Sequence, residues 1–264
     1  MRRKNLFIYI LLLIFAGPLG VLAADAKKPI SLIPKKSSIK IGLGSSLSTT
    51  GTVAAVYFGG VRGDYCEAVI VQNDGKSFNV RMPLAEEDFE AHASATVCTT
   101  LFHANSSQKK IRVTGKVESL KGSYSNGDLY AGYLAIDRIF YFRDGEATLN
   151  DTLSEIPEGA IDVKVMQVLV TPNNPKRYCS AIIRAYGSLH EGVVELPDDY
   201  ASLDSHVQEG VLKNMASICD SLSASITSET EIRIMGDLLS STSKRVEHLS
   251  KYDGITRTYT SPAF

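Results

Sequence analysis

The chain has 264 residues, of which 44% are hydrophobic, and its 28 basic residues almost balance its 29 acidic residues, for a formal net charge of −1. This composition is too apolar and too weakly charged for an intrinsically disordered protein. It also creates no broad positive field for phosphates, so bulk charge argues against a nucleic-acid-binding protein. The length suffices for one large domain or two small ones.

Residues 1–23 have the pattern of a secretory signal peptide. Three basic residues precede an uncharged, mostly apolar run over residues 6–24, which closes on small residues suited to signal peptidase. We therefore predict cleavage after Ala23 and a periplasmic or secreted protein. An uncleaved anchor is the alternative, because the run is almost long enough to span a bilayer. No later stretch is long and apolar enough, so the mature chain is expected to lack an integral membrane segment.

A polar segment rich in Lys, Ser, Thr and Gly follows, and we interpret residues 24–50 as a flexible lead-in. Apolar patterning then predicts three strands, a helix and two strands, and the same order appears a second time. The first set of strands covers 53–58, 66–71, 78–83, 111–115 and 133–142. The second covers 161–170, 179–184, 192–197, 232–236 and the C-terminal segments 240–244 and 255–260.

Each predicted helix carries one apolar stripe, which is typical of an amphipathic helix packed on a core. The first stripe runs from Phe89 to Ala104, and the second comprises Val207, Val211, Met215, Ile218 and Leu222. A partner-binding face is the alternative interpretation of such a stripe. We expect both stripes to face the core.

The two sets of elements share an internal repeat. Cys66 and Cys179 open equivalent strands 113 residues apart, whereas Cys98 and Cys219, in the helices, are 121 residues apart. The pattern Ile-Arg-x-x-Gly after each helix also recurs at a separation of 121. The copies therefore stay in register except for one insertion after Pro197. Such agreement favours a duplicated unit.

Five short strands with a helix between the third and fourth is the order of an OB-type barrel. We therefore predict a β-rich α+β protein made of two tandem OB-like five-stranded barrels, each with a helix between strands 3 and 4. OB-like domain 1 would cover residues 51–145, a linker 146–159, and OB-like domain 2 residues 160–264.

An even number of cysteines in an exported protein suggests disulfides. The repeat selects one of the three pairings, Cys66 with Cys98 and Cys179 with Cys219, so that each bond ties a strand to the helix of its own unit. A zinc site or a catalytic thiol is the alternative. Zinc favours closely spaced ligands, and no two cysteines are near neighbours here.

No motif of an enzyme is evident, and we predict no catalytic residues, no metal ligands and no cofactor. The acidic clusters at 86–88 and 198–199 both follow a proline at the start of a helical region, where negative charge is favoured by the helix dipole. The five histidines show no ligand spacing. The weak candidates for ligand binding are Tyr124 and Tyr130, in a Gly/Ser-rich loop that could contact sugars or peptides.

The run from Phe78 to Pro83, the helix through Cys98 and the strand Lys109-Lys110-Ile111-Arg112-Val113 resemble the binding subunits of bacterial AB-type toxins. Those subunits are disulfide-bonded OB barrels with a long helix between strands three and four. The resemblance implies this fold and the binding of glycans. The chain departs from the family in carrying two units in tandem, and no sugar-binding residue can be carried over to it.

These observations lead to three hypotheses. The first is an exported, non-enzymatic binding protein that presents two OB-like domains to a glycan or protein partner, with oligomers possible and no nucleic acid bound. The second is a structural subunit of a bacterial envelope or secretion assembly. The third, with the least support, is an enzyme with an unrecognised site.

Overall fold

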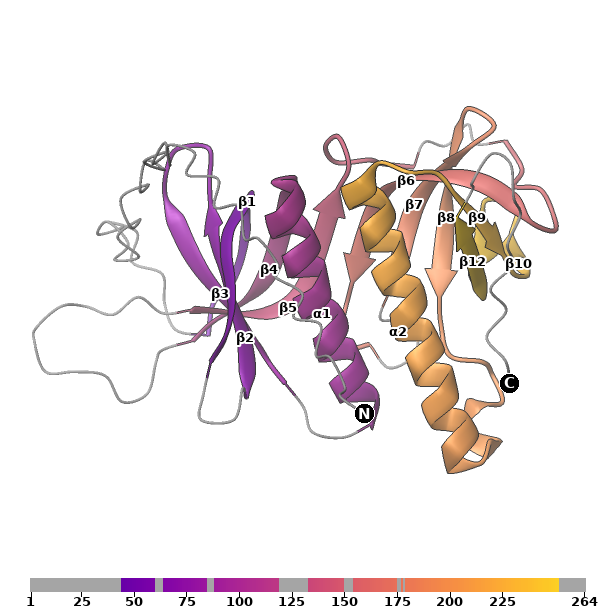
Figure 1. Cartoon of the computed structure of the whole chain (residues 1–264), viewed down its shortest axis with the longest axis horizontal. Helices are drawn as coiled ribbons and strands as arrows, with labels where there is room; N and C mark the ends of the chain where they lie inside the picture. Colours follow the sequence, from indigo (N-terminus) through magenta and orange to yellow (C-terminus); the bar gives the residue numbers. More distant parts are fainter. Residues whose placement is uncertain are drawn as a thin grey trace, which may run out of the picture. The chain divides into compact units, whose positions relative to one another are not determined.

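The computed structural model describes residues 44–59, 64–84, 88–118, 133–149, 154–174, 177 and 179–251. All of them belong to one compact unit, Pro34–Phe264. The predicted signal peptide and most of the predicted lead-in lie outside the described residues, as does the predicted strand at 255–260. The described residues confirm a β-rich α+β protein, with twelve strands and two long helices (Figure 1).

The first half contains five strands and one long helix. Its elements are β1 (Ser46–Gly59), β2 (Tyr65–Val71), β3 (Ser77–Pro83), α1 (Asp88–Ser107), β4 (Lys110–Glu118) and β5 (Tyr133–Phe142). β1 begins earlier than predicted, because the register from Ser46–Lys116 to Thr52–Lys110 pairs residues of the expected lead-in with β4.

The pairings of these five strands close on themselves. β1 pairs with β2 on one side and β4 on the other, β2 pairs with β3, and β5 pairs with both β4 and β3. All pairs are antiparallel except β3–β5. We call this closed set the first ring.

The second half repeats this arrangement with shorter strands at its C-terminal end. Its elements are β6 (Ile161–Val170), β7 (Cys179–Ala185), β8 (Ser188–Val194), a short 3-10 helix (Tyr200–Ser202), α2 (Ser205–Ser228), β9 (Ile232–Met235), β10 (Leu238–Ser240), β11 (Ser243–Arg245) and β12 (His248–Lys251). β8 lies earlier than the predicted strand at 192–197. Tyr186 and Gly187 both have positive φ and reverse the chain in two residues, so that Ala185 already faces Ser188.

A broken strand closes the second set of pairings. β11 pairs with β8 in parallel, and β12 pairs with β9 antiparallel. Between them, the amide of Val246 donates to the carbonyl of Val193 and the amide of Glu247 to that of Met235. Residues 243–251 therefore pair with both β8 and β9, just as the single strand β5 pairs with both β3 and β4 in the first ring. We call the set β6–β12 the second ring.

The register shows which positions are equivalent in the two rings. Phe58 faces Cys66 and Val170 faces Cys179, so Phe58 and Val170 occupy the same place. Ile139 faces Val113 in the first ring, and its counterpart Leu249 faces Ile234 in the second. We use "equivalent" below for positions related by such pairings, or by the 121-residue separation of the helical cysteines.

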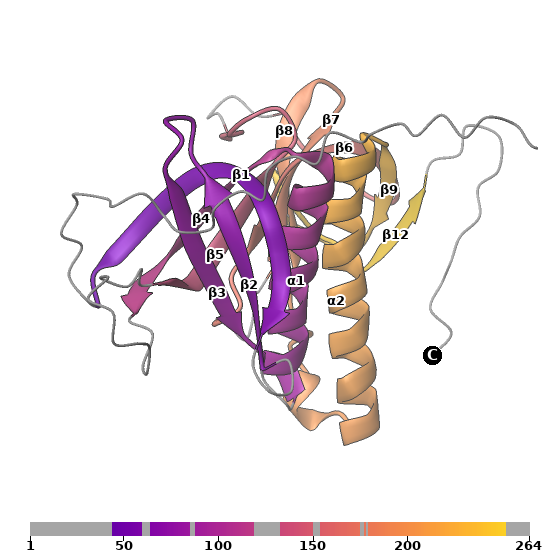
Figure 2. The same cartoon turned by 60° about the vertical axis from the view of Figure 1, so that its left-hand side comes forward.

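The two rings share one sheet and one core. β5 pairs antiparallel with β6 from Ile139–Val170 to Phe142–Gln167. α1 and α2 lie side by side in both views (Figures 1 and 2), where Thr100 Oγ1 is 3.4 Å from Ser223 Oγ and His103 Nε2 is 2.9 Å from Asp220 Oδ1. The buried apolar side chains of both halves form one cluster. Neither helix, within the described residues, is long and apolar enough to cross a membrane.

Candidate functional site

The four cysteines form the two disulfides expected from the repeat. Cys66 is bonded to Cys98 and Cys179 to Cys219, over sequence separations of 32 and 40 residues. All four side chains are buried at the junction of a strand with its helix. They stabilise the two halves and offer no exposed thiol to a substrate.

The other residues singled out from the sequence do not come together in a site. Tyr124 and Tyr130 lie outside the described residues, and so do Glu86 and Glu87. Asp199 precedes the short 3-10 helix and makes no side-chain cap there. Among the described residues, no three His, Cys, Asp or Glu side chains are close enough to hold a metal ion.

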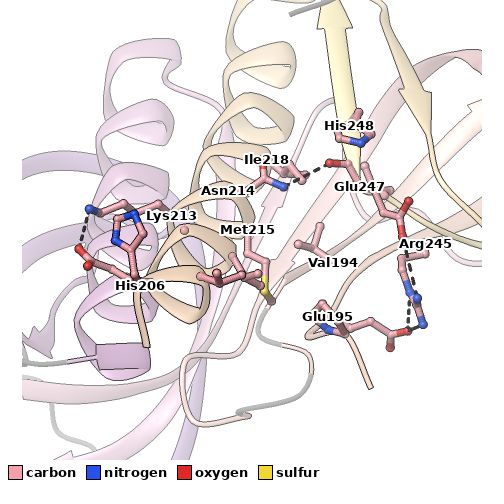
Figure 3. A pocket seen from close by; sticks show the side chains of 16 residues that line it. Val194, Glu195, His206, Lys213, Asn214, Met215, Ile218, Arg245, Glu247 and His248 are labelled. Atoms are coloured by element: carbon pink, nitrogen blue, oxygen red, sulfur yellow. Dashed lines mark hydrogen bonds and ion pairs between the residues drawn. The ribbon is translucent and has the colours of Figure 1, made fainter. Parts of the chain in front are cut away.

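The candidate site is a pocket of about 610 Å³ that the sequence analysis missed (Figure 3). Its walls are the N-terminal half of α2, the end of β8 and the segment 245–248 between β11 and β12. The surface that lines it is mostly apolar, and the apolar side chains include Val194, Val207, Val211, Met215, Ile218 and Val246.

The pocket opens where the second helix lacks a large side chain. Phe89 of α1 is partly buried against the core, and the helical separation of 121 residues places Gly210 at the equivalent position of α2. A Cβ atom on Gly210 would meet no atom within 4 Å. Gly210 therefore presents no side chain to the pocket, at the helix position that Phe89 occupies in the first half.

This arrangement corrects the expectation that the whole stripe of α2 faces the core. Met215, Ile218 and Leu222 are buried as predicted, but Val207 is 42% exposed and Val211 is only partly buried. Both valines line the pocket. Alignment of the two repeats could have indicated the pocket, because it places Gly210 at the position of Phe89. The periodicity of α2 alone cannot indicate it.

Ion pairs around the pocket neutralise its charged rim. The guanidinium of Arg245 donates to Glu195 Oε1 from Nη2 at 3.0 Å and from Nε at 3.2 Å (Figure 3). Lys213 lies 2.6 Å from Glu209 one helical turn away, and this bond lowers the pKa of the Glu209 carboxyl. Asn214 Nδ2 donates to the carbonyl of Glu247 at 3.4 Å. The pocket therefore presents an apolar floor within a rim of paired charges.

A second polar cluster lies on the outer surface of the first ring. The guanidinium of Arg81 stacks between the rings of Tyr65 and Tyr133, at 3.9 and 4.3 Å from their centroids, and donates to the buried Glu67. Tyr57 also donates to Glu67, and burial together with this carboxylate raises the pKa of the Tyr57 hydroxyl. These groups satisfy one another, so the cluster is a structural network across β1, β2, β3 and β5.

The second ring also buries two basic side chains. His190 and Lys244 are both 0% exposed, and Lys244 Nζ has no hydrogen-bond partner among the described residues. Their equivalents in the first ring are Phe78 and Leu134, which are apolar. Burial lowers the pKa of His190. Neither side chain lines the pocket beside α2.

No protein-family model matches the chain, and no curated protein sequence is significantly similar to it. The basis for a functional proposal is therefore the geometry of the described residues.

Proposed function

We propose that this chain is an exported, non-enzymatic binding protein built from two OB-like barrels, and that the pocket beside α2 receives apolar side chains of a protein partner. The cyclic pairings of the two rings, each with a helix between its third and fourth strands, support the OB-like part. The two disulfides and the N-terminal pattern support export to the periplasm or the exterior.

The observation that carries the binding role is the pocket's shape and lining. Its volume of about 610 Å³ falls within the range of ligand-binding pockets. The lining surface is mostly apolar, and the rim charges that form ion pairs are satisfied within the protein. Such a surface favours insertion of apolar side chains from a partner, because burial removes them from water.

A glycan, which the toxin-subunit resemblance implies, is supported less well by this pocket. Sugar recognition usually needs aromatic faces together with free polar groups. Among the described residues that line the pocket, the only aromatic rings are the imidazoles of His206 and His248. The aromatic residues around Arg81 already stack on that guanidinium.

Substitution of Gly210 tests this proposal. Gly210→Phe should fill the pocket as Phe89 does in the first half and weaken ligand binding at least tenfold. The probes are the apolar dye 8-anilinonaphthalene-1-sulfonate, followed by fluorescence, and an array of short peptides rich in aliphatic residues. Because a glycine inside a helix costs about 1 kcal/mol relative to alanine, the variant should not be less stable than the parent.

Gly210→Ala is the matched control. It also replaces the helical glycine but leaves the pocket open, so it should bind both probes like the parent chain. Equal binding by Gly210→Phe and Gly210→Ala would contradict the proposal. Binding on a glycan array that survives Gly210→Phe would instead favour the glycan hypothesis.

A structural role in an envelope or secretion assembly is the second candidate. It is favoured by Phe58 and Phe102, two exposed aromatic side chains whose rings lie 5.7 Å apart at one end of the first half. Contiguous exposed apolar side chains are typical of surfaces that contact other proteins.

A further inference from the structure

One end of the first half exposes positions that are buried in the second half. Phe58 is 57% exposed and Phe102 is 39% exposed, whereas their equivalents Val170 and Ser223 are both 0% exposed. Val170 faces Ile139 of β5, and Ser223 contacts Thr100 of α1. In the second half, β5 and α1 of the first half therefore cover Val170 and Ser223. No described residue covers Phe58 and Phe102 in the same way.

The backbone shows the same difference. Residues 167–170 of β6 pair with β7 on one side and with β5 on the other. The equivalent end of β1, residues 55–58, pairs with β2, but β4 reaches only residues 46–52. Within the described part of the chain, this edge of β1 is unpaired. An unpaired strand edge is a template for another strand.

The opposite end of the second half carries the matching surface. Leu249–Lys251 of β12 are equivalent to Ile139–Tyr141 of β5, the residues that pair with β6. Among the described residues β12 pairs only with β9. On α2, Ser221 and Ala224 stand at the positions of Thr100 and His103, through which α1 contacts α2.

We propose that copies of this chain associate head to tail. The contact between two copies would have the same form as the contact that joins the two halves of one chain, in which β5 pairs with β6 and α1 packs beside α2. The head is Tyr57, Phe58 and Phe102, and the tail is Leu249–Lys251 with Ser221 and Ala224. β12 of one copy pairs antiparallel with β1 of the next. The β5–β6 register sets Leu249 opposite Phe58, Ser250 opposite Tyr57 and Lys251 opposite Val56.

This contact is heterologous, because the head and the tail are different surfaces. Each copy therefore binds one neighbour at each end. Such a contact produces a cyclic oligomer or an open filament and not a two-fold dimer. The contact does not depend on the proposed function of the pocket. The pocket is lined by residues 206–218 of α2 and reaches only His248, the first residue of β12, whereas the tail uses Ser221 and Ala224 and the residues of β12 after His248.

Sedimentation velocity of the exported chain over a wide concentration range tests the association. The mass should grow beyond that of a dimer as concentration rises, and Phe58→Asp or Phe102→Asp should weaken the association at least tenfold. Tyr186→Asp is the matched control, because Tyr186 is a 76% exposed aromatic residue in the β7–β8 turn, away from head and tail. Circular dichroism checks that all three variants fold.

A cysteine pair tests the register itself. A mixture of Tyr57→Cys and Ser250→Cys chains should form a disulfide between copies, whereas Tyr57→Cys with Ser241→Cys, in the β10–β11 turn, should not. The four native cysteines are buried in their own disulfides and do not compete.

Three outcomes would overturn the proposal. They are a monomer at every concentration, an assembly that Phe58→Asp and Phe102→Asp leave intact, or cross-linking of Ser250→Cys no better than that of Ser241→Cys. Gly210→Phe should leave the association unchanged, so failure of the pocket proposal and failure of this one are distinguishable.

Discussion

At the scale of single residues, the comparison of equivalent positions shows where the two halves have diverged. Phe89 of α1 corresponds to Gly210 of α2, and Gly210 lines the pocket without a side chain. Phe78 is replaced by His190 in the interior of the second ring. A completely buried imidazole favours its neutral form, because burial penalises charge.

His190 should make the stability of the protein depend on pH. Its pKa in the folded state is below the ordinary value of 6.5, so its contribution is present above pH 6.5. The contribution is lost as pH falls from there toward the folded-state pKa, because the unfolded chain binds the proton first. Urea unfolding of the parent and of His190→Phe, measured at several pH values, should show a shallower slope for the variant in this window.

An equal slope for the parent and His190→Phe would show that other groups account for the pH dependence.

At the scale of elements, each helix is attached to its ring by one disulfide and one apolar stripe. The Cys66–Cys98 bond joins β2 to α1, and the Cys179–Cys219 bond joins β7 to α2. Each bond closes a loop between a strand and a helix that lie far apart along the chain. Such cross-links act mainly on the unfolded chain by restricting its conformations.

Removal of either disulfide should therefore cost about 4 kcal/mol of unfolding free energy by the loop-entropy relation. Cys66→Ala with Cys98→Ala, and Cys179→Ala with Cys219→Ala, should be destabilised to a similar extent, because their loops of 32 and 40 residues differ little. Urea unfolding under oxidising conditions measures both. A loss below about 1 kcal/mol for either pair would contradict this account.

At the scale of the whole molecule, Tyr141 of β5 connects the two halves. Its side chain is fully buried, and its hydroxyl lies 2.7 Å from Ser107 Oγ of α1 and 2.9 Å from Thr227 Oγ1 of α2. The same strand pairs with β6 of the second half. We therefore expect the two halves to unfold as one cooperative unit.

Tyr141→Phe should remove these bonds at a cost of about 0.5–1.5 kcal/mol, because Ser107 and Thr227 then each lose one half-buried hydrogen-bond partner. Hydrogen exchange should report the loss in β2 and in β7 alike. Tyr133→Phe is the control, since the hydroxyl of Tyr133 donates to the exposed carboxylate of Glu118 and its removal should cost less than about 0.5 kcal/mol. Exchange that accelerates in only one half would contradict the single unit.

Much of the local structure could be predicted from the residues alone. The stripe from Phe89 to Ala104 predicted α1, and the repeated cysteine spacing predicted both disulfides. The limits of β8 could not be predicted, because they depend on the turn at Tyr186 and Gly187, where a non-glycine residue adopts positive φ. The exposure of Val207 could not be predicted either, because a helix stripe does not show how far its core extends.

The sequence by itself determined the helices, most strands and the cysteine pairing, because periodicity and spacing reflect the geometry of each segment. Only the tertiary structure decided that β5 pairs with β6, that α1 packs beside α2, and that Gly210 opens a pocket. These features depend on which distant segments meet. Neighbour choice in a sheet is set by the packing of the whole chain, and no local pattern in the sequence encodes it.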